Sequence, residues 1–302
     1  MDSHDAPIAA LPENAPAQDA SPAQRASIAP WWHTVVLVAA FAWLSWHGAK
    51  SFDQRHGAGV NRFVTYAMTA GMELVMVGWV WLGLRLRKVS FGTIVGKLAH
   101  GAKGIAIDVG VAAVFWLCAM SVLSTLNLVW LLTESAVTHQ PLIPNVQPAK
   151  PGAHKAAPAP APSAEQEKLI KTLARTAPSN RYEIAAWALL CIVVGFAEEV
   201  VFRGYLQRQF AAWFARWPQW LHGYGPTAIG VALSAIVFGS AHGYEGARGM
   251  ALIGVYGVLF GLLALFRRNL RAGMIAHGWH DLFVGLMLAL MKNIGFISSA
   301  QM

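Results

Sequence analysis

The sequence predicts an all-α fold, a polytopic transmembrane helix bundle of about seven to eight spans. Of its 302 residues, 56% are hydrophobic and only 13% are charged, whereas a soluble domain carries about 25% charged residues. Too few charged side chains remain to cover a water-facing surface of this size. The chain also holds 13 tryptophans, a residue enriched where membrane proteins meet the lipid headgroups. These observations place the chain in a lipid bilayer.

The net charge and the cysteine content do not indicate a nucleic-acid-binding protein or a disulfide-stabilised fold. The formal net charge of +8 is what basic cytoplasmic loops of a membrane protein produce, and no nucleic-acid-binding motif accompanies it. We therefore expect the lipid bilayer as a partner and no nucleic acid, while the oligomeric state is left open. Cys118 and Cys191 both lie in apolar runs, so we interpret them as packing residues rather than a disulfide framework.

The N-terminal part is predicted to contain a tail and three spans. Residues 1–30 are rich in Ala, Pro, Asp and Ser and lack hydrophobic periodicity, which predicts a disordered tail. They contain no basic stretch followed by an early apolar core, so we do not expect a cleaved signal peptide. The first apolar run, from Trp31, then serves as a membrane anchor. The region 31–132 is predicted to hold spans near 31–49, 61–84 and 104–132.

A linker and four further spans follow. The linker, residues 133–180, is rich in Pro and Ala, and proline at this density is incompatible with a continuous helix. Within it we expect one short amphipathic helix near 164–176. The domain at 183–291 is predicted to hold spans near 183–212, 226–244, 247–266 and 270–291. With the linker left out, the Lys and Arg distribution favours a cytoplasmic N-terminus, and a bacterial inner membrane is compatible with the retained anchor.

The first polar motif interrupts an apolar span, in the stretch GFAEEVVFRGYLQ. Glu199 and Arg203 are four residues apart and share a helical face, so they can pair. Glu198 is rotated by about 100° and need not share that arginine. An ionisable residue at the centre of a span costs about 2.5–3.5 kcal/mol, so a group of them indicates a functional site. The alternative is that all three lie in water at the end of the span.

Two further spans carry polar residues at helical spacing. His242 ends the stretch ALSAIVFGSAH, four residues after Phe238, and is either a catalyst or a helix cap. His277 and Asp281 are four apart and share a face, so they form either part of a site or a pair that only locks the bundle. At 1.5 Å per residue, the depths of these groups and of Glu198 fall within one layer about 14 Å thick. They can therefore meet at one site.

Three more ionisable residues lie inside the predicted spans. His280 is the neighbour of Asp281 on a different helical face, and we expect it to face the membrane interface, with a fourth polar group in the cavity as the alternative. Glu73 and Asp108 each stand alone in a span and match no motif. For both we expect a structural pairing with another helix or with the interface.

Together the three motifs resemble those of the CPBP family of CAAX-protease-like membrane proteins. The matching stretches are Glu198-Glu199-Val-Val-Phe-Arg203 for EExxxR, Phe238-Gly-Ser-Ala-His242 for FxxxH and His277-Gly-Trp-His-Asp281 for HxxxN/D. Their order also matches, and the resemblance covers residues 183–291. The family contains CAAX prenyl endopeptidases, bacteriocin-processing or immunity proteins, and membrane scaffolds.

The resemblance implies an endopeptidase that hydrolyses a membrane-associated peptide or protein. Glu198 would act as general base on a water molecule, with His242 helping to orient or activate it. His277 and Asp281 would donate hydrogen bonds to the tetrahedral oxyanion. These roles fit peptide hydrolysis, which needs a base for water and donors where negative charge develops.

Three further residues would hold this site together: Glu199, Arg203 and Phe238. Asp281 raises a chemical question, because an ionised aspartate cannot donate to an oxyanion as asparagine can. Either Asp281 is protonated, or it orients a neighbouring histidine, or it ligates a metal ion.

A zinc ion is the alternative to a metal-free glutamate mechanism. Glu198, His242 and His277 form a plausible His2Glu ligand set with an open fourth position. The sequence contains no HExxH motif, so the usual zinc-peptidase spacing is missing. We therefore favour the metal-free mechanism without a cofactor.

Two rival functions remain for the same residues. The chain would be a catalytically silent membrane scaffold or immunity protein of the same fold, or a proton-coupled transporter in which buried Glu and His form a relay. Transporters often contain internal repeats, and we find no convincing repeat between 31–132 and 183–291. The complete set of motif residues favours the endopeptidase over the silent scaffold.

Overall fold

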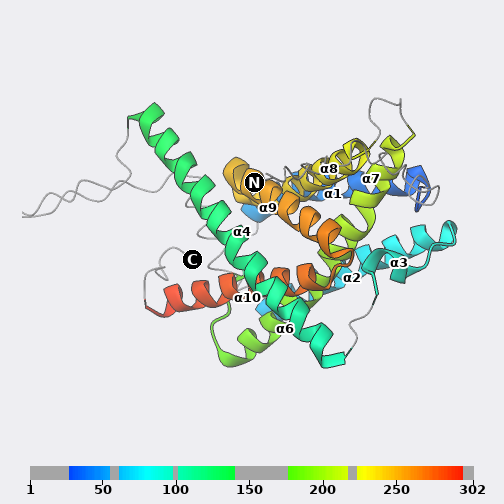
Figure 1. Ribbon diagram of the computed structural model, residues 1–302. Coiled ribbons are helices and arrows are strands. Elements are labelled where there is room, and N and C mark those ends of the chain that lie inside the picture. The colour runs from blue at the N-terminus through cyan, green and yellow to red at the C-terminus, as the bar shows by residue number, and fades with distance from the viewer. Residues whose placement is uncertain (1–26, 55–60, 98–100, 140–175, 217–222, 295–302) are drawn as a thin grey trace, which may run out of the picture.

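The structure is a computed structural model that describes residues 27–54, 61–97, 101–139, 176–216 and 223–294. Every regular element in these ranges is a helix (Figure 1), which confirms the all-α fold. The elements are α1 (Trp31–Gln54), α2 (Arg62–Leu86), α3 (Phe91–Val95), α4 (Gly101–Thr138), α6 (Arg181–Glu198), η1 (Glu199–Leu206), α7 (Gln207–Phe214), α8 (Gly225–Ala241), η3 (Gly243–Glu245), α9 (Gly246–Arg267) and α10 (Arg271–Asn293).

Five helical stretches of the described chain are long and apolar enough to cross a membrane, so the chain is an integral membrane protein. They are Arg62–Leu86, Gly101–Thr138, Arg181–Phe214, Gly243–Arg267 and Arg271–Asn293. Helix α8 is apolar but shorter, and α1 is not among the five. Both helices form where spans were predicted, and their crossing of the membrane stays a prediction.

The ends of the predicted tail and linker differ from the sequence-based boundaries. Residues 27–30 were placed in the disordered tail, yet Ala29 is fully buried. The side chain of Gln209 accepts from the backbone N–H groups of Ile28 and Ala29 and donates to the Ala29 carbonyl. The third span also continues as α4 to Thr138, beyond its predicted end at residue 132. Residues 1–26 and 140–175, with almost all of the predicted amphipathic helix, lie outside the described residues.

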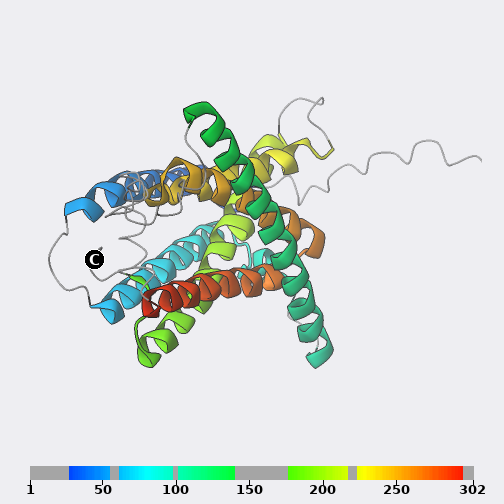
Figure 2. The same ribbon diagram turned by 90° about the vertical axis from the view of Figure 1, so that its left-hand side faces the viewer.

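The helices form two layers joined by one continuous helical stretch (Figure 1). Helices α2, α6 and α10 pack together in one layer, and α1, α8 and α9 form the other. The stretch α6–η1–α7 begins in the first layer and reaches the second, where α7 packs against α8. Helix α4 lies outside the bundle and contacts only α10 and α9 among the strong helix pairs, as the turned view in Figure 2 shows.

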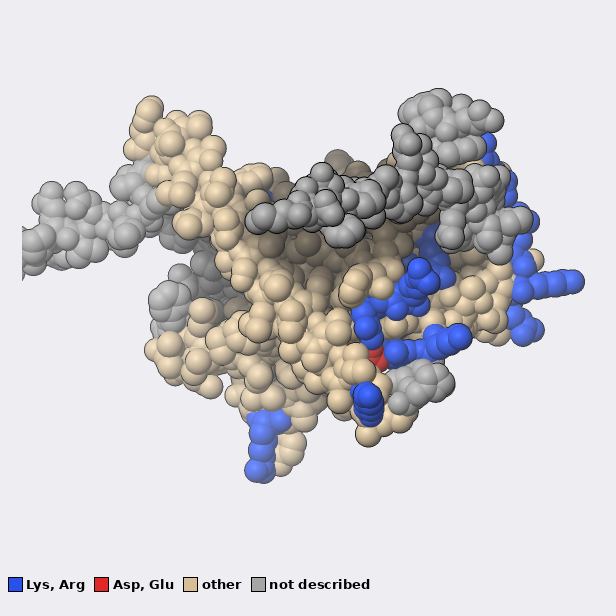
Figure 3. Space-filling model, in the orientation of Figure 1, with Lys and Arg blue, Asp and Glu red and all other residues tan. Residues whose placement is uncertain are grey.

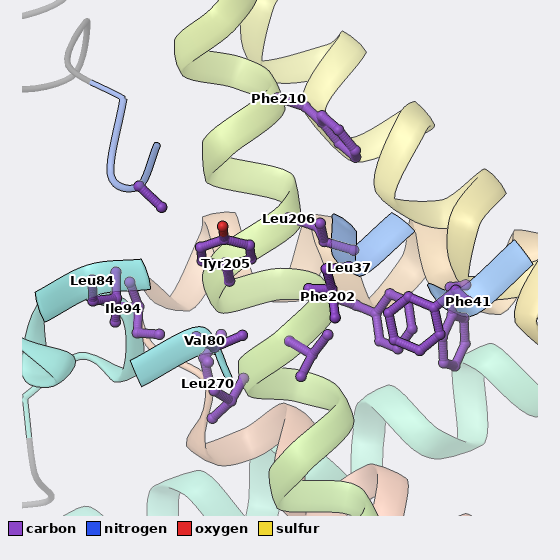
Figure 4. Packing of buried hydrophobic residues seen from close by; sticks show 14 residues of the cluster. Leu37, Phe41, Val80, Leu84, Ile94, Phe202, Tyr205, Leu206, Phe210 and Leu270 are labelled. Carbon is purple, nitrogen blue, oxygen red and sulfur yellow. The ribbon is translucent and has the colours of Figure 1, made fainter. Parts of the chain in front are cut away.

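The π-helix η1 is the centre of the hydrophobic core, and every one of its residues is buried. Phe202 packs against Phe41 of α1, with ring centroids 5.1 Å apart. Figure 4 shows Phe202, Tyr205 and Leu206 among side chains of the surrounding helices. This packing fixes the point where the chain passes from one layer to the other.

Glycines allow α6 and α10 to touch along their backbones. A Cβ on Gly195 would lie 2.8 Å from the backbone nitrogen of Gly278, so no larger residue fits without a shift. Small residues at such contacts are typical of membrane helix pairs. On α10, a Cβ on Gly273 would lie 2.9 Å from Oε2 of Glu199, so this glycine leaves room for the carboxylate. The end of α6 is thereby held against α10.

Basic side chains gather at one end of the molecule (Figure 3). Here α3 joins other elements: the Leu270 N–H donates to the Val95 carbonyl, and Arg208 donates to the Thr93 carbonyl. The Lys and Arg residues on the helix ends and turns that meet here are Arg85, Arg87, Lys88, Lys97, Lys103, Arg208, Arg216, Arg267, Arg268 and Arg271. The opposite helix ends carry fewer described basic side chains: Arg62, Arg181, Arg248 and Lys292.

Candidate active site

The two adjacent glutamates lie where α6 becomes the π-helix η1. Glu198 is the last residue of α6, and Glu199 is the first of η1. A π-helix is wider than an α-helix and is frequent at functional sites. Because this junction lies between the two helix layers, side chains from both layers can reach it.

His277 of α10 stands between the two carboxylates. Its Nε2 lies 3.3 Å from Oε2 of Glu198, and its Nδ1 is in hydrogen-bonding contact with Oε1 of Glu199 at 3.2 Å. The residue is 4% exposed. Both ring nitrogens thus face a carboxylate, and the contact of Nδ1 with Glu199 is the hydrogen bond of the two. The structure therefore brings together the first and third motifs, as the sequence predicted.

Glu199 differs from Glu198 because it also has an arginine. Nη1 of Arg203 lies 3.1 Å from Oε1 of Glu199, and both side chains are 1% exposed. This confirms the predicted pair at four-residue spacing. The Glu198 side chain makes its ion contact with His277 alone within the described chain, and it is 12% exposed. One carboxylate is thus fully enclosed and paired with a guanidinium, and the other is more open.

Aromatic rings pack against the Arg203 guanidinium. Its carbon Cζ lies 4.2 Å from the ring centroid of Phe238 and 4.9 Å from that of Phe260. Phe260 also stacks on His277, with centroids 5.1 Å apart. Phe238 is thus part of the site's packing, as expected, and Phe260 of α9 is a supporting residue that sequence reasoning missed.

His242 is the C-cap residue of α8. A helix cap was the alternative to a catalytic role in the sequence-based prediction. Its Nδ1 donates to the carbonyl oxygen of Phe238 at 2.9 Å, because a carbonyl can only accept. No hydrogen bond or ion pair joins it directly to Glu198 in the parts of the chain that the structure describes. Nε2 is the nitrogen that remains available for a ligand.

Asp281 lies one turn after His277 on α10 and faces the same site. Its carboxylate interacts electrostatically with His277, Glu198 and His242. Its backbone carbonyl accepts from the indole N–H of Trp187 at 3.1 Å, which ties this turn of α10 to α6. All four predicted catalytic residues therefore lie around the same junction.

The expectation for His280 was wrong. This residue was predicted to face the membrane interface, but its ring packs against Tyr256 with centroids 5.0 Å apart. Its Nδ1 is buried and has no hydrogen-bond partner in the described chain. The one-residue offset from Asp281 turns the ring toward α9 rather than toward lipid, because α9 covers that face of α10.

Glu73 of α2 is a site residue that sequence reasoning assigned to a structural pairing or the interface. It is 4% exposed, and its Oε2 has no hydrogen-bond partner within the described residues. Its carboxyl interacts electrostatically with Glu198, His277 and Asp281. These partners lie on two different helices, so the carboxyl lies beside the contact between α6 and α10. The available signal was a lone acid inside an apolar span.

Two residues of the second layer also reach the site without having been predicted. Glu245, in the short η3 turn after His242, interacts electrostatically with His242 and Glu198. Tyr256 of α9 has a buried hydroxyl without a hydrogen-bond partner in the described chain. A tyrosine in an apolar helix and an acid in a turn are ordinary features, so the sequence alone carried no signal for either.

The residues do not fit the zinc alternative. No group of three or more His, Cys, Asp or Glu in the described chain is arranged to hold a metal ion. In the predicted set of Glu198, His242 and His277, both nitrogens of His277 already face carboxylates. We therefore derive no step through zinc.

The fold and this site define a helical membrane protein with carboxylates and imidazoles gathered at one helix junction. The family model described as Type II CAAX prenyl endopeptidase Rce1-like matches residues 180–283. The C-terminal part of the chain is thus similar to this protease family, which supports the predicted CPBP resemblance. No curated protein and no solved structure matches the chain.

Proposed function

We propose that the chain is an intramembrane endopeptidase in which Glu198 activates a water molecule to cleave a membrane-associated peptide or protein. One observation carries the proposal. Two adjacent carboxylates in the matched domain have different ion partners within the described chain, because Glu199 is paired with Arg203 and the ion contact of Glu198 is with the His277 imidazole. The carboxylate that lacks a guanidinium is the one suited to take a proton from water.

His242 and His277 have different bonding partners, which supports different roles for the two histidines. His242 uses Nδ1–H for the Phe238 carbonyl, so in the neutral ring Nε2 is an acceptor that can bind the same water from the second layer. His277 holds Glu198 in place through Nε2. Glu198 takes a proton from the water while its oxygen attacks the scissile carbonyl. Glu198 then returns that proton to the leaving amine.

We also propose that the N-terminus faces the cytoplasm. The basic end of the molecule contains the residues just before α1, the end of α2, the start of α4 and the turn between α9 and α10. Positively charged residues favour the cytoplasmic side of a membrane. In a bacterium, this is the cytoplasmic side of the inner membrane. Protease protection of an N-terminal tag in inside-out vesicles tests this orientation, and a protected tag would contradict it.

The test of the activity uses detergent-purified protein and a library of peptides. Wild type is compared with Glu198→Gln and His242→Ala, each with and without a strong chelator. We expect cleavage by wild type that survives chelation and is lost in both folded variants. Loss on chelation with recovery in zinc would replace this mechanism with a metal site. Equal cleavage by the variants would show that the site is wrong, and no cleavage by any protein would favour a silent scaffold or transporter.

A further inference from the structure

The hydroxyl of Tyr256 is a buried donor without a use in the described fold. The residue is 4% exposed on α9, and its oxygen has no hydrogen-bond partner among the described residues. Leaving such a group unpaired in a protein interior costs free energy. A buried hydroxyl in this situation normally meets water or a ligand.

The position of Tyr256 points to a ligand of the site. Its ring packs against His280 at 5.0 Å and lies 6.5 Å from His277, measured between centroids. Its hydroxyl interacts electrostatically with Asp281, Glu199 and Arg203. The hydroxyl therefore lies at the boundary of α9 with η1 and α10, beside the groups proposed to act on the substrate.

The proposed reaction needs a donor that Asp281 and His277 do not supply. Negative charge develops on the carbonyl oxygen of the scissile bond and must be met by hydrogen-bond donors. An ionised Asp281 can only accept, and both nitrogens of His277 face glutamates. A tyrosine hydroxyl is neutral and has a proton to donate.

We propose that the Tyr256 hydroxyl donates a hydrogen bond to the scissile carbonyl oxygen as its negative charge develops. This inference rests on the proposed endopeptidase function and extends it to a residue outside the three motifs. Tyr256 keeps its proton throughout. The water proton passes to Glu198 and then to the leaving amine, while the C–O bond forms and the C–N bond breaks.

The first test is Tyr256→Phe, assayed on a peptide that wild type cleaves in a Glu198-dependent way. Removing one oxyanion donor lowers kcat by about 100-fold or more, and we expect KM to change little. The melting temperature should not fall, because the lost hydroxyl had no partner in the described fold. An unchanged kcat in the folded variant would overturn the inference.

Tyr205→Phe is the matched control. Its hydroxyl lies 2.7 Å from Nδ1 of His33 and 2.8 Å from Oγ1 of Thr34, away from the carboxylates. Its removal should lower the melting temperature and leave kcat near that of wild type. A similar loss of kcat in both variants would show a packing effect and overturn direct donation.

A second variant separates donation from packing. Asp281→Asn introduces an amide donor, so it should recover part of the kcat lost in Tyr256→Phe. If the losses from the two changes simply multiply, Tyr256 acts elsewhere and the inference fails. If the wild type cleaves in a Glu198-dependent way and Tyr256→Phe is equally active, only this inference is overturned. A wild type that cleaves nothing overturns the proposed function, and this inference with it.

Discussion

Two acids in the N-terminal helices carry the same sequence signal but have opposite environments. Asp108 of α4 is 1% exposed, and its two carboxylate oxygens accept from Arg267, at 2.9 Å, and from Arg271. Glu73 of α2 is 4% exposed and has no ion pair in the described chain. It lies instead near Glu198, His277 and Asp281.

The difference between them separates structure from function. Asp108 joins α4 to the turn between α9 and α10, which confirms the structural pairing expected for it. Glu73 brings a further acid to a site that already contains several, and no Lys or Arg of the described chain forms an ion pair with it. A buried acid in a membrane is costly, so one without an ion pair beside a candidate site is the better indicator of function.

Removing the guanidinium that pairs with Glu199 should have the largest effect on stability and activity. Arg203→Ala leaves a fully buried carboxylate without its guanidinium. Breaking a buried pair on one side costs about 3–5 kcal/mol, so we expect unfolding or aggregation in detergent and no cleavage. Thermal unfolding measures the loss, and Arg203→Lys should retain part of the stability. A stable Arg203→Ala protein would show that compensation is unimportant in the centre of this bundle.

Neutralising Glu198 should affect activity and leave folding intact. Within the described chain this carboxylate makes its ion contact with His277, so Glu198→Gln removes the base and keeps a side chain of the same shape. A general base contributes about 10²–10⁴-fold, and we expect kcat/KM to fall by about 1,000-fold. The melting temperature serves as the folding control. A variant that keeps its activity would assign the base to another group.

Asp108→Asn tests the compensated acid. The change weakens contacts with two arginines that remain partly exposed, at 23% of each side chain. We expect a loss of about 1–3 kcal/mol in stability, measured by thermal unfolding, while the folded fraction keeps wild-type kcat. A fall in kcat at unchanged stability would reverse the assignment of Asp108.

Glu73→Gln is the counterpart of Asp108→Asn at the other buried acid, and it should give the smallest effect. No ion pair is lost, so stability should stay constant or rise. Because the carboxyl faces the catalytic candidates, we expect kcat/KM to fall by about tenfold, within the range of acid–base contributions or below it. If Glu73→Gln loses stability but not activity, the two acids are alike and the distinction between them fails.

Features that depend on neighbouring residues could be predicted from the amino-acid sequence. Apolar runs of sufficient length predicted the helices, because a bilayer admits only segments with satisfied backbone groups. The spacing from Glu199 to Arg203 predicted their ion pair, because four residues make about one helical turn. The order of the three motifs predicted the family that the domain at 180–283 matches.

Which distant side chains meet depends on the packing of the whole helix bundle. The glycine contact between α6 and α10 brings His277 between Glu198 and Glu199, and no local pattern states which helices will touch. Glu73 and Tyr256 belong to helices far apart in sequence. The lone acid makes the span of Glu73 unusual but does not indicate its partners, and the span of Tyr256 looks like any other apolar run. Periodicity gives the face that a residue occupies on its own helix, whereas the partner of that face depends on how all the helices pack.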